Sequence, residues 1–274
     1  MRKYKIERKK LEFDDRNINL LVATPLKSQR DKNHTPCVLW IHGGGYYKGR
    51  KEMFYITRAK ALVKKYGAVV VCLDYRLSKK HPYPAALEDC YEVLKYIKTQ
   101  SEELNFNINK IFVGGESAGG GLAIALSIYA RDKKEINIAY HMPLCPMIDY
   151  RETVSSRNNT APFWNTKMNK KAWGLYLKNI EKISKYASPS LETNFQNLPP
   201  CYTFVGDIEP FLDETVTYVN NLKKAGIEAE VDVYENWFHS YDLIFPFTKK
   251  GKTAIKKFED KFLYAIEHYS ASNL

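Results

Sequence analysis

Residues 111–122 read IFVGGESAGGGL. An apolar run stops at Ser117, which only glycine, alanine and one glutamate surround, and an apolar helical pattern follows at once. The segment GESAG (115–119) fits the pattern G-x-S-x-G, which on a strand-to-helix turn lifts a serine hydroxyl above the sheet. Glycine and serine are also frequent in ordinary turns. The pattern alone therefore leaves both a nucleophile and a turn residue open.

Apolar runs and helical patterns alternate along the whole chain. The alternation from Ile6 to Val22 around DDRN (14–17) predicts an N-terminal hairpin. We expect further strands over 37–41, 68–73, 110–114, 138–144, 201–206 and 229–235, and helices over 54–66, 84–98, 118–131, 211–225 and 251–268. This order is typical of an α/β fold, with a mostly parallel sheet, helices on both faces and a site at the carboxyl ends of the strands.

The length of 274 residues suits a single α/β domain spanning 1–274. Residues 150–190 break the alternation with a polar loop and the aromatic-rich stretch PFWNTKMNKKAWGLYL. The segment is much longer than a usual connection between a helix and a strand. We expect it to form a small cap over the strand ends, the alternative being an ordinary crossover helix with long flanks.

The chain is basic, with 42 Lys and Arg against 31 Asp and Glu and a net charge of +11. The lysines are spread in pairs such as Lys64-Lys65 and Lys249-Lys250, and no nucleic-acid-binding motif accompanies them. We expect a solvated lysine-rich surface and no nucleic-acid partner. The longest apolar stretch, near 121–130, is too short to span a bilayer, so we expect no stable membrane insertion.

Cysteine usage favours a reducing compartment. The number is odd, no CxxC pair occurs, and most of the cysteines lie in or beside apolar strand-like runs, which favours buried thiols without disulfides. The N-terminus, MRKYKIERKKLEF, lacks the apolar core of a signal peptide. We expect a cytoplasmic protein without a bound metal, and the sequence leaves its oligomeric state open, a homodimer included. The five cysteines are Cys37, Cys72, Cys90, Cys145 and Cys201.

A second motif changes the balance for Ser117. The strand expected over 37–41 ends in HGGG (42–45), where glycines leave backbone N–H groups free to approach a developing oxyanion. A serine nucleophile also needs a base, oriented by an acid, in the chain order Ser, Asp/Glu, His. His239 follows the last expected strand and fits this order, whereas His268 falls within the terminal helix. We expect Ser117 and His239 to be nucleophile and base.

These motifs together resemble the hormone-sensitive-lipase-like branch of the α/β-hydrolases, the bacterial family IV esterases. The resemblance implies a carboxylic-ester hydrolase without a cofactor, and N–H groups of Gly44, Gly45 and Ala118 as donors to the oxyanion. It also implies a supporting role for HPYPAALED. The matching segments are HGGG (42–45), DYRL (74–77), HPYPAALED (81–89), GESAGGGLA (115–123), LPP (198–200), EPFLDE (209–214) and FHSYD (238–242).

The acid departs from the pattern of these relatives, which carry aspartate before the proline of D-P-L-x-D-E. In an ungapped register that position is Glu209, and Asp207 lies two residues earlier. A glutamate can accept the histidine Nδ1–H as an aspartate does, so we favour Glu209 and keep Asp207 as the alternative. Asp213 and Glu214 fit the first turn of the following helix, where negative charge suits the helix dipole.

Relatives also have a longer segment before HGGG, so the cap here would come mainly from 150–190. Phe163 and Trp164 are candidate walls of the substrate pocket, with plain packing as the alternative. A thin cap predicts an open site and small or short-acyl esters.

Three functions remain open on the sequence. The first is a serine carboxylesterase with a small-molecule ester substrate. The second is an arylformamidase or small-amide hydrolase built from the same parts. The third is a non-catalytic ligand receptor on this fold, which would be expected to lose the serine or the base, whereas both are present here.

Overall fold

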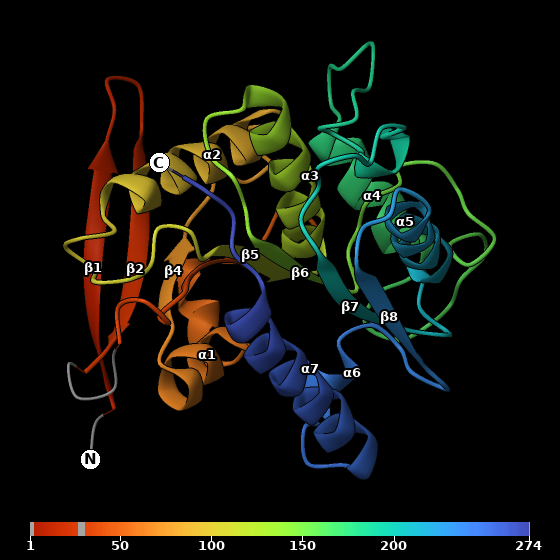
Figure 1. The fold of residues 1–274 in the computed structure, drawn as a ribbon. Coiled ribbons are helices and arrows are strands. Elements are labelled where there is room, and N and C mark those ends of the chain that lie inside the picture. Colours follow the sequence, from red (N-terminus) through yellow and green to blue (C-terminus); the bar gives the residue numbers. More distant parts are fainter. Residues whose placement is uncertain (1–2, 27–30, 274) are drawn as a thin grey trace.

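The computed structural model describes residues 3–26 and 31–273. Its centre is an eight-stranded sheet with the spatial order β1-β2-β4-β3-β5-β6-β7-β8 (Figure 1). The strands are β1 (Tyr4–Glu12), β2 (Asn17–Pro25), β3 (Cys37–Ile41), β4 (Val69–Leu73), β5 (Ile111–Glu116), β6 (Tyr140–Leu144), β7 (Cys201–Gly206) and β8 (Ala229–Tyr234).

The sheet is parallel from β4 through β8, and the hairpin β1–β2 adds two antiparallel strands at one edge. In the parallel part each strand is followed by helical structure, so the carboxyl ends of β3, β5, β7 and β8 lie along one edge of the sheet. The expected α/β fold is confirmed.

Helices cover both faces of the sheet. In Figure 1, α1 and α7 lie below the sheet and α2, α3 and α5 lie above it. The helices are η2 (Lys51–Tyr55, 3-10), α1 (Ala59–Tyr66), α2 (Ala85–Thr99), α3 (Ala118–Lys133), α4 (Thr166–Tyr176), η3 (Pro189–Leu191, 3-10), α5 (Leu212–Lys224), α6 (Tyr241–Ile244) and α7 (Lys249–His268).

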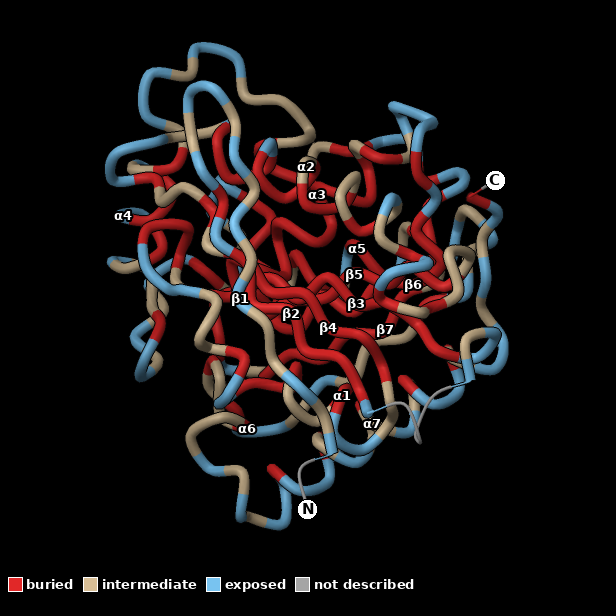
Figure 2. Tube along the Cα trace, turned by 90° about the vertical axis from the view of Figure 1, so that its left-hand side faces the viewer, coloured by how far each residue is buried: buried red, intermediate tan, exposed pale blue. Residues whose placement is uncertain are grey.

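The central strands are buried on both sides, which explains their uninterrupted apolar sequences. In β3, Leu39 and Ile41 pack toward α2 and α3, whereas Val38 and Trp40 pack toward α1 and α7. Figure 2 shows β2 to β5 within the buried centre, with exposed segments confined to loops and outer faces. Such a two-sided core holds the strand ends rigidly in place.

The predicted first residue of one helix is wrong. The helix expected over 54–66 is split into η2 and α1, and α1 begins only at Ala59. Arg58, which precedes it, is buried and its guanidinium pairs with Asp242, so a long-range ion pair and not local periodicity sets the break. The end is as expected, because Gly67 adopts a left-handed conformation with φ 68°.

The segment expected as a cap contains α4 and irregular chain on either side of it. All five cysteines are buried with free thiols, as expected. Within the described residues, no helix combines the length and the apolar character that crossing a bilayer requires.

Candidate active site

Ser117 occupies a sharp corner between β5 and α3. Its backbone has φ 58° and ψ −122°, a combination that is strained for a residue with a side chain. Neighbouring backbone groups hold the corner, because Ser117 N–H donates to Leu144 O (2.9 Å) and Ser117 O accepts from the N–H groups of Gly121 (2.9 Å) and Met147 (3.1 Å). The strain is therefore built into the fold and not left to a mobile loop.

The close packing around the glycines next to Ser117 explains why only small residues fit there. A Cβ atom on Gly119 would lie 2.1 Å from Ile41 O, and one on Gly115 would lie 2.5 Å from the same oxygen. The start of α3 thus packs directly against the end of β3. This contact brings the serine and the HGGG segment together.

The HGGG segment lies against the serine. A Cβ atom on Gly43 would lie 3.3 Å from Ser117 Cβ. Across the described chain, the backbone N–H groups of Gly44, Gly45 and Ala118 have no hydrogen-bond acceptor. Free backbone donors at a helix start and in a glycine turn are the groups that a developing oxyanion requires.

His42 supports this loop as a neutral ring. Its Nδ1 contacts Gly43 O (2.8 Å), and the ring stacks on Tyr75 with centroids 4.1 Å apart. Burial lowers the pKa of His42 to about 4, so the ring is uncharged at neutral pH. Asp89, in HPYPAALED, accepts hydrogen bonds from Arg76 and Arg16 and so ties α2 to the segment after β4 and to the turn between β1 and β2.

The loops after β7 and β8 bring an acid and a base together. His239 Nδ1 lies 2.5 Å from Glu209 Oε2, and both side chains are buried. The other carboxylate oxygen, Oε1, accepts the Gly206 N–H at 2.6 Å. Glu209 is therefore held at both oxygens and can orient the imidazole and stabilise its charged form.

Asp207, the alternative acid, lies elsewhere. Its Oδ1 accepts the N–H of Trp237 (3.2 Å), and its own N–H donates to Tyr234 O (3.1 Å). It fastens the start of the loop that carries His239. His268 is exposed and stacks on Tyr264, away from the loop.

Cys145 links the backbone of Ser117 with this acid–base pair. Cys145 Sγ and single ligand atoms of Glu209 and His239 all lie within 4.8 Å of one another. Burial raises the pKa of the Cys145 thiol, as do the charges of nearby carboxylates, while the backbone N–H of Ser117 lowers it. The thiol thus borders both the serine backbone and the acid–base pair. Ser117 Oγ makes no hydrogen bond to any described residue.

Trp164 covers this arrangement from the segment 150–190. Its ring centroid lies 6.1 Å from that of His239, and its Cη2 would be 2.5 Å from a Cβ atom on Gly45. Its Nε1 donates to buried Asn169 (3.4 Å). Phe163, in contrast, is 56% exposed and stacks on Phe238.

The side chains at the centre of the site are buried. Ser117 is 6% exposed, His239 5% and Trp164 6%. Phe163, which precedes buried Trp164, adopts a left-handed backbone with φ 66°.

The sequence analysis did not identify a buried ionisable group next to the serine, Glu116. Both carboxyl oxygens of Glu116 lack hydrogen-bond partners among the residues described. Burial, together with the nearby charge of Asp242, raises the pKa of Glu116 to about 8, and Arg58 only partly counteracts this. The motif GESAG contains this glutamate, but nothing in the sequence indicates that Arg58 and Asp242 meet it.

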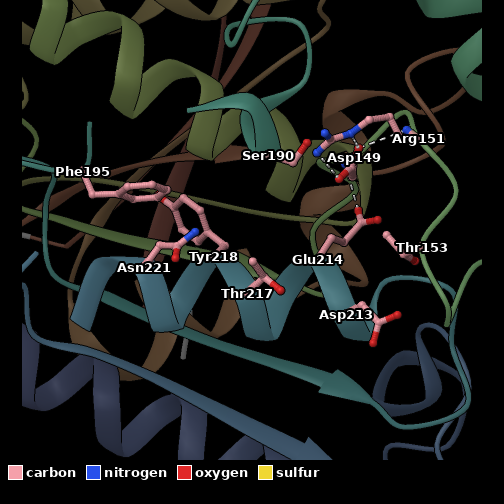
Figure 3. A pocket seen from close by; sticks show the side chains of 10 residues that line it. All are labelled: Asp149, Arg151, Thr153, Ser190, Phe195, Asp213, Glu214, Thr217, Tyr218 and Asn221. Atoms are coloured by element: carbon pink, nitrogen blue, oxygen red, sulfur yellow. Dashed lines mark hydrogen bonds and ion pairs between the residues drawn. The ribbon is translucent and has the colours of Figure 1, made fainter. Parts of the chain in front are cut away.

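The first turn of α5 anchors the segment 150–190. Glu214 accepts the N–H groups of Ile148 (2.7 Å) and Asp149 (3.2 Å), and Asp213 accepts that of Ser155 (2.7 Å). Figure 3 shows Glu214 and the Asp149–Arg151 pair at one end of a cavity of about 100 Å³, and Phe195 and Tyr218 at the other. None of the candidate catalytic residues lines this cavity.

Fold and site together define a hydrolase of the α/β class, in which a serine, a carboxylate and a histidine follow the carboxyl ends of β5, β7 and β8. A family model described as "alpha/beta hydrolase fold" matches residues 38–243. The chain therefore belongs to the α/β-hydrolase family, in its hormone-sensitive-lipase-like branch, and is an enzyme of the hydrolase class.

Named relatives agree with this assignment. Esterase LipI of Mycobacterium tuberculosis is 30% identical over 215 residues, 77% of this chain and 67% of its own length. Carboxylesterase NlhH of the same organism is 27% identical, covering 82% and 75% of the two chains. Among solved structures, a bacterial heroin esterase superposes with a TM-score of 0.87 at 28% identity, over 97% of this chain and 83% of that one.

Proposed function

We propose that the protein is a serine carboxylesterase that cleaves small or short-acyl carboxylic esters. The observation that carries the proposal is the buried pair of His239 and Glu209 beside the strained Ser117. Relatives named as esterases support the same reaction class. The segment 150–190 serves as the cap over this site.

In the proposed reaction, Ser117 Oγ attacks the ester carbonyl carbon while His239 Nε2 takes the hydroxyl proton. Glu209 accepts the Nδ1–H and stabilises the resulting imidazolium. The tetrahedral intermediate then expels the alcohol, which receives that proton from His239. Water, deprotonated by His239, attacks the acyl-enzyme and releases the carboxylic acid, which regenerates Ser117.

The oxyanion of each tetrahedral intermediate is bound by the N–H groups of Gly44, Gly45 and Ala118. These groups are already free and oriented by the fold, so no reorganisation is needed as charge develops. Each such donor is worth about 3 kcal/mol of barrier in acyl transfer. The arrangement therefore favours an acyl substrate with a planar carbonyl.

The preference for short acyl groups rests on Trp164. Its ring touches the oxyanion loop at Gly45 and lies near the imidazole of His239, so it occupies space next to the reacting carbonyl. Asn169 and Phe211 hold the ring in place. Phe163 forms the outer rim with Phe238.

The test is hydrolysis of p-nitrophenyl acetate, butyrate and octanoate by the wild type, Ser117→Ala and a matched control, Ser127→Ala. Ser127 is a buried serine in the same helix whose hydroxyl donates to Ala123 O. We expect Ser117→Ala to lower kcat/KM by about 10⁴-fold or more, and Ser127→Ala to keep the wild-type rate. Equal rates for the wild type and Ser117→Ala would refute the proposal.

A further inference from the structure

Cys145 lies in the floor of the site, where the catalytic reaction gives it no role. It follows β6, and its N–H donates to Phe204 O (2.9 Å), which fixes the residue between β6 and β7. The side chain is 3% exposed. Its sulfur and one ligand atom each of Glu209 and His239 lie within 4.8 Å of one another, and across residues 3–26 and 31–273 no other group of His, Cys, Asp and Glu side chains converges in this way.

We infer that Cys145, His239 and Glu209 form an inhibitory site for a soft or borderline divalent cation such as Zn²⁺ or Cd²⁺. Thiolate, imidazole and carboxylate are the three ligand types that zinc takes in proteins, and three protein ligands leave a fourth position for water. The inhibition rests on the proposed function, because it acts through the acid–base pair of that reaction.

Binding of a cation would require small movements of the three ligand atoms. Zinc bonds of about 2.0–2.3 Å place tetrahedral ligand atoms roughly 3.3–3.8 Å apart. Ligand atoms at the 4.8 Å limit would have to approach by about 1.0–1.5 Å, whereas His239 Nδ1 and Glu209 Oε2, now 2.5 Å apart, would have to separate by about 1 Å. All three come from the ends of adjacent strands, β6, β7 and β8, so the loops that would move are short.

The charge around the site also suits a cation. The carboxylates of Glu209 and Asp242 lie near Cys145, and Arg58 is the cation that pairs with Asp242. A bound metal replaces the thiol proton of Cys145, which passes to solvent. Negative charge near the sulfur therefore favours a cation at this place.

The bound cation would stop catalysis through either imidazole nitrogen. At Nε2 it blocks the atom that takes the Ser117 proton. At Nδ1 it displaces the hydrogen bond to Glu209 and leaves the remaining ring proton on Nε2, which then has no lone pair for the serine proton. Ester hydrolysis would fall in both cases.

The experiment measures hydrolysis of p-nitrophenyl butyrate against ZnCl₂ or CdCl₂ in a buffer without chelator or thiol. The variants are wild type, Cys145→Ala and the control Cys201→Ala, which removes another buried thiol, in β7. Inhibition is expressed relative to the metal-free rate of each variant. We expect Cys145→Ala to raise the inhibitory metal concentration about tenfold or more, and Cys201→Ala to leave it unchanged.

A binding measurement separates this inference from the proposed function. CdCl₂ is titrated into Ser117→Ala and into the double variant Ser117→Ala/Cys145→Ala, and the ultraviolet charge-transfer band of the cadmium–thiolate bond is followed. A band that requires Cys145 supports the site even if no ester is cleaved. Equal inhibition of wild type and Cys145→Ala, or equal bands in both Ser117→Ala proteins, would overturn it and leave the esterase proposal standing.

Discussion

The two halves of the candidate site are built differently. The half that holds Ser117 and HGGG lies on β3, β5 and α3, where backbone meets backbone without side chains between them. The half that holds Glu209 and His239 lies on loops after β7 and β8, where side chains and a cap residue define the geometry. The first half is fixed by close packing, and the second by a few hydrogen bonds and aromatic contacts.

This difference indicates which kind of substitution should disturb each half. A single added methyl group should disturb the backbone half through the fold itself. The loop half should depend most on single hydrogen-bonding atoms, and it resists added volume at Gly206, where a Cβ atom would lie 2.0 Å from Trp237 O. Four predictions test this contrast.

The largest effect is expected from Glu209→Gln. The amide keeps the volume but loses the charge that stabilises the imidazolium, so kcat/KM should fall by about 10³–10⁴-fold with little change in thermal unfolding. Asp207→Asn retains an oxygen for the Trp237 N–H and should lose less than about tenfold. Steady-state kinetics on p-nitrophenyl butyrate compare the two variants. If kcat/KM fell only in Asp207→Asn, Asp207 and not Glu209 would be the acid.

Gly119→Ala should destabilise the backbone half. Its methyl group would lie 2.1 Å from Ile41 O, so β3 and α3 would have to separate, which should lower the free energy of unfolding by about 3 kcal/mol or more. Gly174 in α4 has no atom within 4 Å of an added Cβ, so Gly174→Ala should raise it by about 0.5–1 kcal/mol. Urea denaturation measures the free energy of unfolding of both variants. Equal changes in Gly119→Ala and Gly174→Ala would contradict the proposed role of close packing at Gly119.

Glu116→Gln tests the buried carboxyl between the halves. A pKa of about 8 in the folded protein, against an ordinary 4.5, means that the folded state binds the proton more tightly. Stability should therefore fall as pH rises from about 4.5 to about 8. The glutamine variant should lack this fall, which these two pKa values set at about 4 kcal/mol between pH 5 and pH 9.

The measurement for Glu116 is urea denaturation at several pH values, with Glu235→Gln as a control at an exposed position. The control should follow the wild type. An unchanged pH dependence in Glu116→Gln would show that other groups cause any alkaline loss.

The smallest effect is expected from Trp164→Ala. Removing the indole beside Gly45 and His239 should raise the ratio of kcat/KM for octanoate over acetate about tenfold. Phe163→Ala, at the exposed rim, should change this ratio about twofold or less. If both variants keep the wild-type ratio, Trp164 does not limit the acyl length.

The same contrast explains how much could be predicted from the sequence. The backbone half depends on glycines at fixed spacing along the chain. Its two segments, HGGG and GESAG, could therefore be identified from the sequence alone. The order of strands and helices along the chain, and the place of His239 after the last strand, followed from the alternation of apolar runs and helical patterns. Glu209 needed an alignment register with relatives, because two acids lie two residues apart in that loop.

Other features depend on contacts between distant segments. The ion pair of Arg58 with Asp242 joins residues 184 positions apart and sets the start of α1, which periodicity had placed too early. The convergence of Cys145 with Glu209 and His239 arises from three separate strand ends. Buried Trp164 follows the left-handed backbone at Phe163, a conformation for which a phenylalanine gives no local signal.

The tie between Ser155 and the start of α5 has a consequence for how this chain can change over evolutionary time. Ser155 donates hydrogen bonds to Asp213 and Pro210, and Asn159 donates one to Ile208. The segment is therefore held on both sides of Glu209. An insertion near 153–159 would shift the acid along with the cap. The exposed stretch near 178–182 carries no such tie to the loop of Glu209. Variation in length, and with it new substrate ranges, should accumulate there first.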